Sequence, residues 1–234
     1  MKVLLDHKEP INYNVTTFWF KPPRKVSYTA GQFTELYLPH KNPDERGEKR
    51  WFTLSSSPNE NLISITTKFA DKTSSTFKKT LWALRPGAEI SAAEPMGDFV
   101  LPKDKSIPLV FVAGGMGLTP YHSIVKWLGE TKEHRQIQFI YAVNKPSDAI
   151  FIDLFESYRI KPILVTAEPS RDWKGESGHL KAQRILDLAE GYKDKRIYVS
   201  GPEPMVEELM KGLEKLEVPK NDLVGDYFPG YPPV

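Results

Sequence analysis

Two turns rich in glycine and proline carry the residues of this sequence best suited to hold a phosphorylated ligand. The first turn, residues 113–120, reads Ala-Gly-Gly-Met-Gly-Leu-Thr-Pro and follows the most apolar run of the chain. Glycine permits positive φ angles and lets phosphates approach the backbone, while a following helix offers unpaired N–H groups at its start. Thr119 suits the N-cap and Pro120 the first helical position. The turn departs from the usual dinucleotide fingerprint, because Pro120 stands where that pattern has its third glycine.

The second turn, residues 199–205, reads Val-Ser-Gly-Pro-Glu-Pro-Met and repeats this pattern after a later apolar run. Either turn alone is compatible with a plain loop, in which Met205 belongs to the core of the following helix. On one edge of the same sheet, the two turns predict a nucleotide bound across the ends of the strands.

Short runs rich in Val, Ile, Thr, Phe and Tyr precede these turns and predict a small antiparallel β-barrel or sandwich. One helix is expected over 75–84, because Phe77, Leu81 and Leu84 follow a helical spacing and Pro-Gly ends it. The expected strands of this half are 15–20, 32–38, 51–55, 62–67 and 89–93.

After a bridge at 102–108 the pattern changes to strands that alternate with helices, which predicts a five-stranded parallel, doubly wound sheet. The predicted domains are therefore 1–103 and 107–234. The expected strands are 107–113, 137–143, 163–166, 197–200 and 223–228, and the later helices are 150–158, 182–188 and 203–216.

Composition excludes several functions. The 234 residues carry 32 Lys and Arg against 30 Asp and Glu, a balance that does not fit a dedicated nucleic-acid binder. The chain has no cysteine, which excludes cysteine-ligated zinc and iron–sulfur clusters, so redox chemistry needs an organic cofactor. The five histidines are scattered, and no metal site is expected. No apolar run approaches the ~20 residues of a membrane helix, so a cytoplasmic protein without a membrane partner is expected. A monomer is also expected.

Residues 50–53, Arg-Trp-Phe-Thr, form a third candidate ligand-binding motif. On a strand, Arg50 and Phe52 share one face, where a guanidinium could hold a pyrophosphate and an aromatic ring could stack on a flat ligand. The string resembles the Arg-x-Tyr/Phe-Ser/Thr flavin motif of the ferredoxin–NADP reductase superfamily. Residues 114–120 resemble that family's Gly-Gly-x-Gly-x-Thr-Pro, and residues 200–206 its Cys-Gly-Pro-x-x-Met-Val. The resemblance covers nearly the whole chain.

This resemblance implies an N-terminal FAD-binding β-barrel followed by an NAD(P)-binding α/β domain. In the barrel, Arg50 would hold the FAD pyrophosphate, Phe52 would pack on the isoalloxazine and Thr53 would bond to flavin N5. Trp51 is counted with these cofactor-binding residues, although its side of the strand favours the core. The resemblance also implies that the strand residues Thr66, Thr67 and Lys68 line the adenosine-diphosphate part of FAD. The start of the following helix would bind its phosphates through Ser74, Ser75 and Thr76, although the glycine that the family has there is absent.

In the second domain the resemblance implies contacts with the nicotinamide nucleotide. Ser200, where many members have cysteine, would border the nicotinamide, and Phe228 or Tyr231 would cover the flavin. Thr53, Ser200 and Phe228 are thus the expected catalytic residues, and Asp226 stands where the family often has an acid. The remaining nucleotide-binding residues implied are Gly114, Gly115, Gly117, Thr119, Pro120, Thr166, Gly201, Pro202 and Met205.

The implied activity is transfer of a hydride from NADH or NADPH to FAD, followed by electron delivery to a small redox protein such as a ferredoxin, a flavodoxin or an oxygenase component. A patch on the modestly basic first half would suit an acidic partner, although an ordinary solvated helix face explains it equally well. Its candidate residues are Lys72, Lys78, Lys79 and Arg85.

The choice of nucleotide is open. Thr166 and Ala167, followed by Glu168, favour NADH. Three residues of the next loop could instead accommodate NADPH: Ser170, Arg171 and Lys174. Two other functions also stay open. The first is a free-flavin or ferric reductase that acts on small acceptors, and the second is a non-catalytic nucleotide-binding module.

Overall fold

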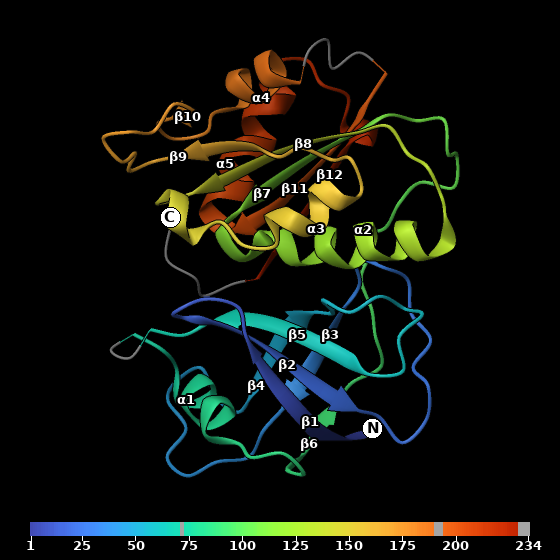
Figure 1. Cartoon of the computed structure of the whole chain (residues 1–234), viewed down its shortest axis with the longest axis vertical. Helices are drawn as coiled ribbons and strands as arrows, with labels where there is room; N and C mark the ends of the chain where they lie inside the picture. The colour runs from blue at the N-terminus through green and yellow to red at the C-terminus, as the bar shows by residue number, and fades with distance from the viewer. Residues whose placement is uncertain (71–72, 190–193, 229–234) are drawn as a thin grey trace. The chain divides into compact units, whose positions relative to one another are not determined.

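The computed structural model describes residues 1–70, 73–189 and 194–228, and its contacts divide the chain into two units, Met1–Val100 and Leu101–Val234. Figure 1 shows the first unit in blue to green and the second in green to red. The first unit is built on an antiparallel sheet and the second on a parallel sheet. This architecture confirms the fold class expected from the sequence.

The first unit contains a six-stranded sheet in the order β4-β3-β6-β1-β2-β5. Alternate residues of these strands point to one side of the sheet and form its core. Helix α1 covers this core with Phe77 and Leu81. The elements are β1 (Lys2–Pro10), β2 (Val15–Lys21), β3 (Phe33–Tyr37), β4 (Lys49–Thr53), β5 (Ile63–Lys68), α1 (Thr76–Ala83) and β6 (Glu89–Ala92).

Strand β1 is not among the strands expected in this unit. Val3 and Leu5 are buried, but Leu4 is exposed and a register shift between Leu5 and His7 breaks the alternation. The charged side chains that follow therefore hide the period of two on which strand prediction rests. β1 pairs with both β2 and β6 and so occupies the interior of the sheet.

The second unit contains a six-stranded parallel sheet in the order β10-β9-β8-β7-β11-β12, one short strand more than expected. The strands are β7 (Leu109–Gly114), β8 (Ile137–Val143), β9 (Ile163–Thr166), β10 (Glu176–Ser177), β11 (Arg196–Pro202) and β12 (Leu223–Phe228). The helices are η1 (Gly115–Leu118), α2 (Thr119–Thr131), η2 (Pro146–Asp148), α3 (Ile152–Ser157), α4 (Ala182–Leu188), α5 (Glu203–Lys215) and η3 (Lys220–Asp222).

Helices cover both faces of this sheet, as a doubly wound fold requires (Figure 1). On one face Val110 and Val112 of β7 share a cluster with residues of α4 and α5. On the other face the ring of Phe111 lies 4.6 Å from Tyr121 of α2, and Phe139 of β8 lies 4.6 Å from Phe155 of α3. The fully apolar strand β7 is thus buried from both sides.

No helix among the described residues is long and apolar enough to cross a membrane. Within the same residues, no group of three or more His, Asp or Glu side chains is placed to hold a metal ion.

Candidate functional site

The first glycine turn joins β7 to α2 through the short 3₁₀ helix η1. The expected capping is wrong by one residue, because Leu118 is the N-cap and Thr119 is already helical. The Thr119 hydroxyl donates to the carbonyl of Met116, at 3.1 Å, and Pro120 lies in the first turn of α2. The reason is that η1 provides a helical lead-in, so α2 needs no extended cap residue.

Glycines of this turn serve mainly to let two strand ends pack together. A Cβ on Gly114 would overlap the Met205 sulfur, and one on Gly117 would overlap the Ser200 carbonyl. Gly115 differs, since its φ is +51° and the space where its Cβ would stand is open. Gly115 is therefore the glycine of this turn that leaves room for a ligand against the backbone.

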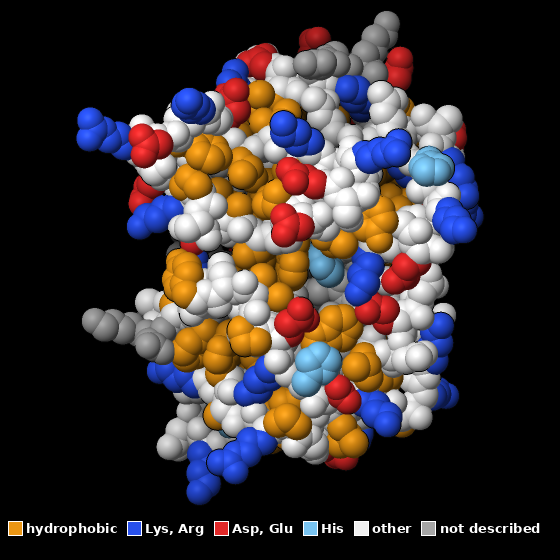
Figure 2. All heavy atoms as spheres, in the orientation of Figure 1, with side chains coloured by type: hydrophobic (Ala, Val, Ile, Leu, Met, Phe, Trp, Pro, Cys, Tyr) orange, Lys and Arg blue, Asp and Glu red, His pale blue; other side chains and the backbone are white. Residues whose placement is uncertain are grey.

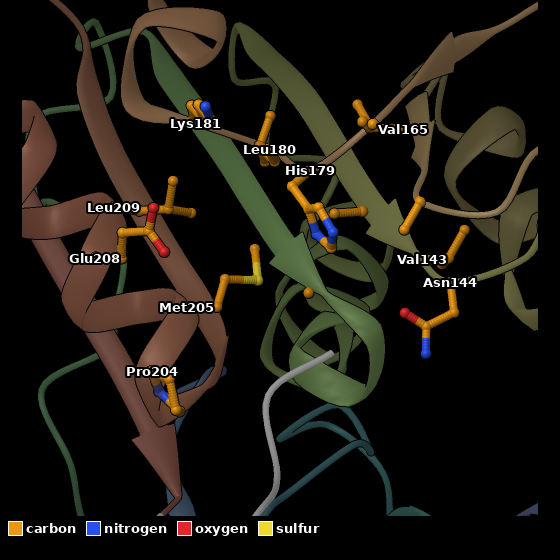
Figure 3. Close-up of a pocket in the computed structure, with 14 residues that line it drawn as sticks. Val143, Asn144, Val165, His179, Leu180, Lys181, Pro204, Met205, Glu208 and Leu209 are labelled. Carbon is orange, nitrogen blue, oxygen red and sulfur yellow. The ribbon is translucent and has the colours of Figure 1, made fainter.

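A cavity of about 340 Å³ lies at the carboxyl ends of β7, β8 and β9 (Figure 3). Its apolar lining includes Val143, Val165 and Leu209, and the side chain of Met205 points into it from α5. Of the residues expected at the nucleotide site, Gly114 and Met205 line this cavity. An apolar cleft at the carboxyl ends of parallel strands is where α/β folds bind nucleotides.

Four polar residues that line the cavity were not identified as site residues from the sequence: Asn144, His179, Lys181 and Glu208. Asn144 directly follows β8, so the strand-end rule could have found it. His179 and Lys181 lie in the loop between β10 and α4, and Glu208 lies in α5, where no local pattern marks them. Within the described chain, neither Lys181 nor Glu208 forms an ion pair with another residue, so a cation and an anion face this cleft.

Thr166 does not face this cavity as a ligand-binding hydroxyl. Its side chain is fully buried and donates a hydrogen bond to the carbonyl of Asn144, at 2.8 Å. It thus fixes the end of β8 relative to β9. Glu168, two residues later, lies 3.5 Å from the ammonium of Lys145, so a carboxylate with a cation partner stands at this edge of the sheet.

Ser200, which is buried, and Asp226, which is partly buried, form a pair at the ends of β11 and β12. The two residues are partners in the parallel register, and the Ser200 hydroxyl donates a hydrogen bond to the Asp226 carboxylate. Burial raises the pKa of Asp226 from 3.8 to about 6, although this hydrogen bond acts in the opposite direction. A carboxyl that titrates near neutrality therefore lies beside the residue expected to border the nicotinamide.

The end of β12 is described only in part. Phe228 is the last residue of β12 and pairs with Pro202, which is buried, next to the partly buried Gly201. Its side chain and the whole of Tyr231 lie outside the described residues, so the expected flavin-covering ring is not located.

In the first unit, Trp51 and Phe52 have opposite exposures to those expected. Phe52 is 5% exposed and packs in the core, with its ring 5.9 Å from that of Phe77, whereas Trp51 is 46% exposed. Arg50 and Phe52 do share one face of β4, but that face points toward the core and α1. The sequence establishes that alternate residues share a face; it does not say which face is inside.

Thr53 is the residue of this motif whose environment calls for a ligand. Its side chain is 3% exposed, and its hydroxyl oxygen has no hydrogen-bond partner among the described residues. A buried hydroxyl without a partner is unfavourable unless another group satisfies it. Thr53 therefore fits the expected bond to a flavin nitrogen.

Hydroxyls at the start of α1 are instead engaged within the chain. Ser75 is the N-cap and accepts from the backbone N–H of Lys78, at 3.2 Å. The Ser74 hydroxyl accepts from the N–H of Ala70, at 2.8 Å, and the Thr76 hydroxyl contacts His40 and the Asp44 N–H, each at 2.9 Å.

On β5 the expected lining residues point into the unit rather than toward an open site. Thr66 hydrogen-bonds to the hydroxyl of Thr17, at 2.9 Å, and Thr67 is 3% exposed. Lys68, at the end of the strand, is partly buried and its carbonyl accepts from the ammonium of Lys78, at 2.9 Å.

Known proteins resemble this chain along most of its length. Residues 111–211 match the model of the oxidoreductase NAD-binding domain. The reductase subunit of stachydrine N-demethylase from Rhizobium meliloti is 27% identical over 87% of this chain and 59% of its own length. The glycine betaine monooxygenase reductase subunit of Chromohalobacter salexigens is 29% identical over 86% of this chain and 57% of its own. This chain thus spans a little under three fifths of these two relatives.

The fold agrees with solved reductase structures. The cytochrome b5 reductase domain of Ulva prolifera nitrate reductase superposes with a TM-score of 0.82 at 20% identity, covering 96% of both chains. A ferredoxin NADP+ reductase from Neisseria gonorrhoeae with bound FAD and NADP superposes with a TM-score of 0.77 at 17% identity, covering 97% of this chain and 98% of that one. The architecture and the NAD-binding domain define a two-domain oxidoreductase fold. Residues 111–211 thus correspond to an oxidoreductase NAD-binding domain, and the chain as a whole has the fold of these reductases.

Proposed function

We propose that this chain is an FAD-dependent reductase that takes a hydride from NADH or NADPH and passes electrons to a redox partner protein. The observation that carries this proposal is the cleft at the carboxyl ends of β7, β8 and β9, inside the part of the chain that matches the oxidoreductase NAD-binding domain. The first unit would hold FAD and the second the nicotinamide nucleotide.

FAD, when bound, supplies the group that accepts the hydride and can release electrons singly or as a pair. The chain's own residues would hold and orient it. Thr53 would donate or accept a hydrogen bond from its buried hydroxyl, and Arg50 with the start of α1 would bind the pyrophosphate. Trp51 offers an exposed aromatic ring on the same strand, whereas the ring of Phe52 is covered.

On the nucleotide side, the turn at Gly115 before α2 would receive the phosphates, because the space beside its backbone is open. The apolar cleft would take a ring system, with Lys181 and Glu208 available to its polar groups. Glu168 supports NADH as the preferred donor, since a carboxylate binds a ribose diol and repels a 2′-phosphate.

Ser200 and Asp226 would act at the nicotinamide end. A Ser200 hydroxyl that donates to Asp226 is fixed in direction, so its oxygen lone pairs face away from the carboxyl. Asp226 would hold or release a proton close to neutral pH. The pair would thus orient the nicotinamide and adjust the local charge.

The electron acceptor is proposed to be an oxygenase component or a small redox protein. The two relatives described above are, by name, reductase subunits of a demethylase and a monooxygenase. Of the candidate basic patch, Lys78 is engaged with the Lys68 carbonyl and Lys72 lies outside the described residues. Figure 2 shows Lys and Arg side chains scattered over the visible face among acidic and hydrophobic ones, so charge on that face does not define a docking site.

The test uses the purified chain supplied with FAD. We expect flavin absorbance that NADH bleaches faster than NADPH does at equal concentration. Turnover with a reduced-protein acceptor such as a ferredoxin or an oxygenase component, but not with free FMN, would support the proposed acceptor. Rapid turnover with free FMN or ferric iron would instead identify a small-molecule reductase. A chain that binds nucleotide but gives no bleaching with any flavin would be a non-catalytic binding module.

A further inference from the structure

The carboxylate of Asp44, a residue of the chain itself, is bound at the start of helix α1. One carboxylate oxygen of Asp44, in the loop between β3 and β4, accepts the backbone N–H of Thr76 at 2.9 Å. In return, the N–H of Asp44 donates to the hydroxyl of Thr76, also at 2.9 Å. Two reciprocal hydrogen bonds therefore fasten the loop to the first residue of α1.

Arginines surround the same carboxylate. The guanidinium of Arg46 donates to Asp44 at 2.8 Å, and that of Arg50 lies 3.7 Å from its other oxygen. Burial raises the pKa of Asp44, but the hydrogen bonds from Arg46 and Thr76 more than offset it and bring the pKa down to about 2. The carboxylate is therefore ionised at every pH at which the protein would work, and another anion rather than a proton must compete with it.

Arg50 and the N–H groups at the start of α1 are the same donors that a cofactor phosphate would need. A carboxylate and a phosphate oxygen make equivalent hydrogen bonds with these donors, and two anions at one cluster of donors repel each other. We propose that Asp44 holds the place of the FAD pyrophosphate in the cofactor-free chain, and that its carboxylate and loop 39–48 must leave α1 when FAD binds. This inference rests on the proposed binding of FAD to the first unit.

Displacement of the Asp44 carboxylate lowers the affinity for the phosphate-bearing part of the cofactor. The contacts of Asp44 with Thr76 and the arginines must be lost for those of the pyrophosphate to form. Riboflavin, which lacks phosphate, gains nothing from the removal of Asp44. The selectivity for FAD over riboflavin is therefore weaker in the natural chain than in one that lacks the Asp44 carboxylate.

The first experiment measures FAD and riboflavin affinity by quenching of flavin fluorescence on addition of cofactor-free protein. Asp44→Asn should lower the Kd for FAD by about tenfold, the effect of removing one charged hydrogen bond from the free state, with riboflavin unchanged. Glu45→Gln is the matched control, because it removes one negative charge from an exposed neighbouring position in the same loop. It should change the FAD Kd by less than about twofold.

The second experiment locks the loop in place. The chain has no cysteine, so Asp44→Cys combined with Thr76→Cys introduces its only two thiols. The oxidised protein should bind FAD at least about tenfold more weakly than the same protein after reduction, while riboflavin binds both forms equally. This comparison within one variant does not depend on how the substitutions affect folding.

Each outcome decides the matter. An FAD Kd that is unchanged or higher in Asp44→Asn, or equal in the oxidised and reduced double variant, would overturn displacement and make Asp44 part of the loaded site. If Glu45→Gln lowers the FAD Kd as much as Asp44→Asn does, the effect comes from the loss of one negative charge in the loop and displacement is refuted. Equal Kd values for riboflavin and FAD would refute the pyrophosphate site but would still support a site for the flavin ring. Failure of every form to bind any flavin would instead refute the proposed function.

Discussion

Replacing the partly buried acid Asp226 with Asn should make the protein more stable at neutral pH and remove one component of its pH dependence. Burial raises the pKa of this carboxyl in the folded chain from 3.8 to about 6. The folded state therefore binds more protons than the unfolded state between these two values, and stability falls as pH rises through them. At about 1.4 kcal/mol per pH unit, the ionised Asp226 carboxylate costs about 3 kcal/mol above the folded-state pKa.

Asn removes this cost because it is never ionised, and its carbonyl oxygen still accepts the Ser200 hydrogen bond. The measurement is urea unfolding of the natural chain and Asp226→Asn at about pH 4 and about pH 8. We expect the variant to gain up to about 3 kcal/mol relative to the natural chain between the two conditions. Asp172→Asn, at an exposed loop position, is the control and should show no such gain.

Two results would refute the reasoning. If the natural chain and Asp226→Asn differ by the same amount at both pH values, the Asp226 carboxyl carries no cost of ionisation. If Asn destabilises the protein at about pH 8, the carboxylate is stabilised by its surroundings and burial does not dominate.

Three further substitutions test single contacts. Thr53→Val should leave the free energy of unfolding within about 1 kcal/mol, because no hydrogen bond is lost, yet weaken FAD binding about tenfold in a fluorescence titration; unchanged affinity would exclude a bond from this hydroxyl. Gly117→Ala should lower stability in urea by at least about 2 kcal/mol, since its Cβ would overlap the Ser200 carbonyl, and a neutral effect would contradict this packing. Phe52→Ala should cost about 3–5 kcal/mol through the cavity left beside Phe77, whereas weakened flavin binding at full stability would show a stacking role instead.

The spacing of apolar residues and the breaks between apolar runs were enough to predict most elements of the second unit. β8, β9, β12 and α4 have the expected bounds, because each is a short apolar or amphipathic run between clear breaks. β10 could not be predicted, since two residues give no period. β1 failed for a related reason, because its register shift disrupts the alternation that identifies a strand.

The site was predictable where it depends on local sequence and not where it depends on contacts between distant segments. The glycine turn was predicted, but the close packing of Met205 against Gly114 joins residues that are far apart in the chain. The contact of Asp44 with Thr76 likewise spans 32 residues and leaves no local pattern. The inward side of β4 was decided by the core that Phe77 of α1 builds, which the strand's own alternation does not reveal.

The order of strands in the parallel sheet has a consequence for how the second unit is made. β7 comes first in the chain but lies in the middle of the sheet, and its neighbour β11 follows only after three other strands. During synthesis, the half-sheet β7–β10 therefore presents an unpaired edge of an entirely buried strand until β11 emerges, which is the kind of edge that recruits other chains. The cleft is incomplete until α5, which follows β11, has supplied Met205 and Glu208. A bound nucleotide could therefore stabilise the unit only after the period in which the edge of β7 is unpaired.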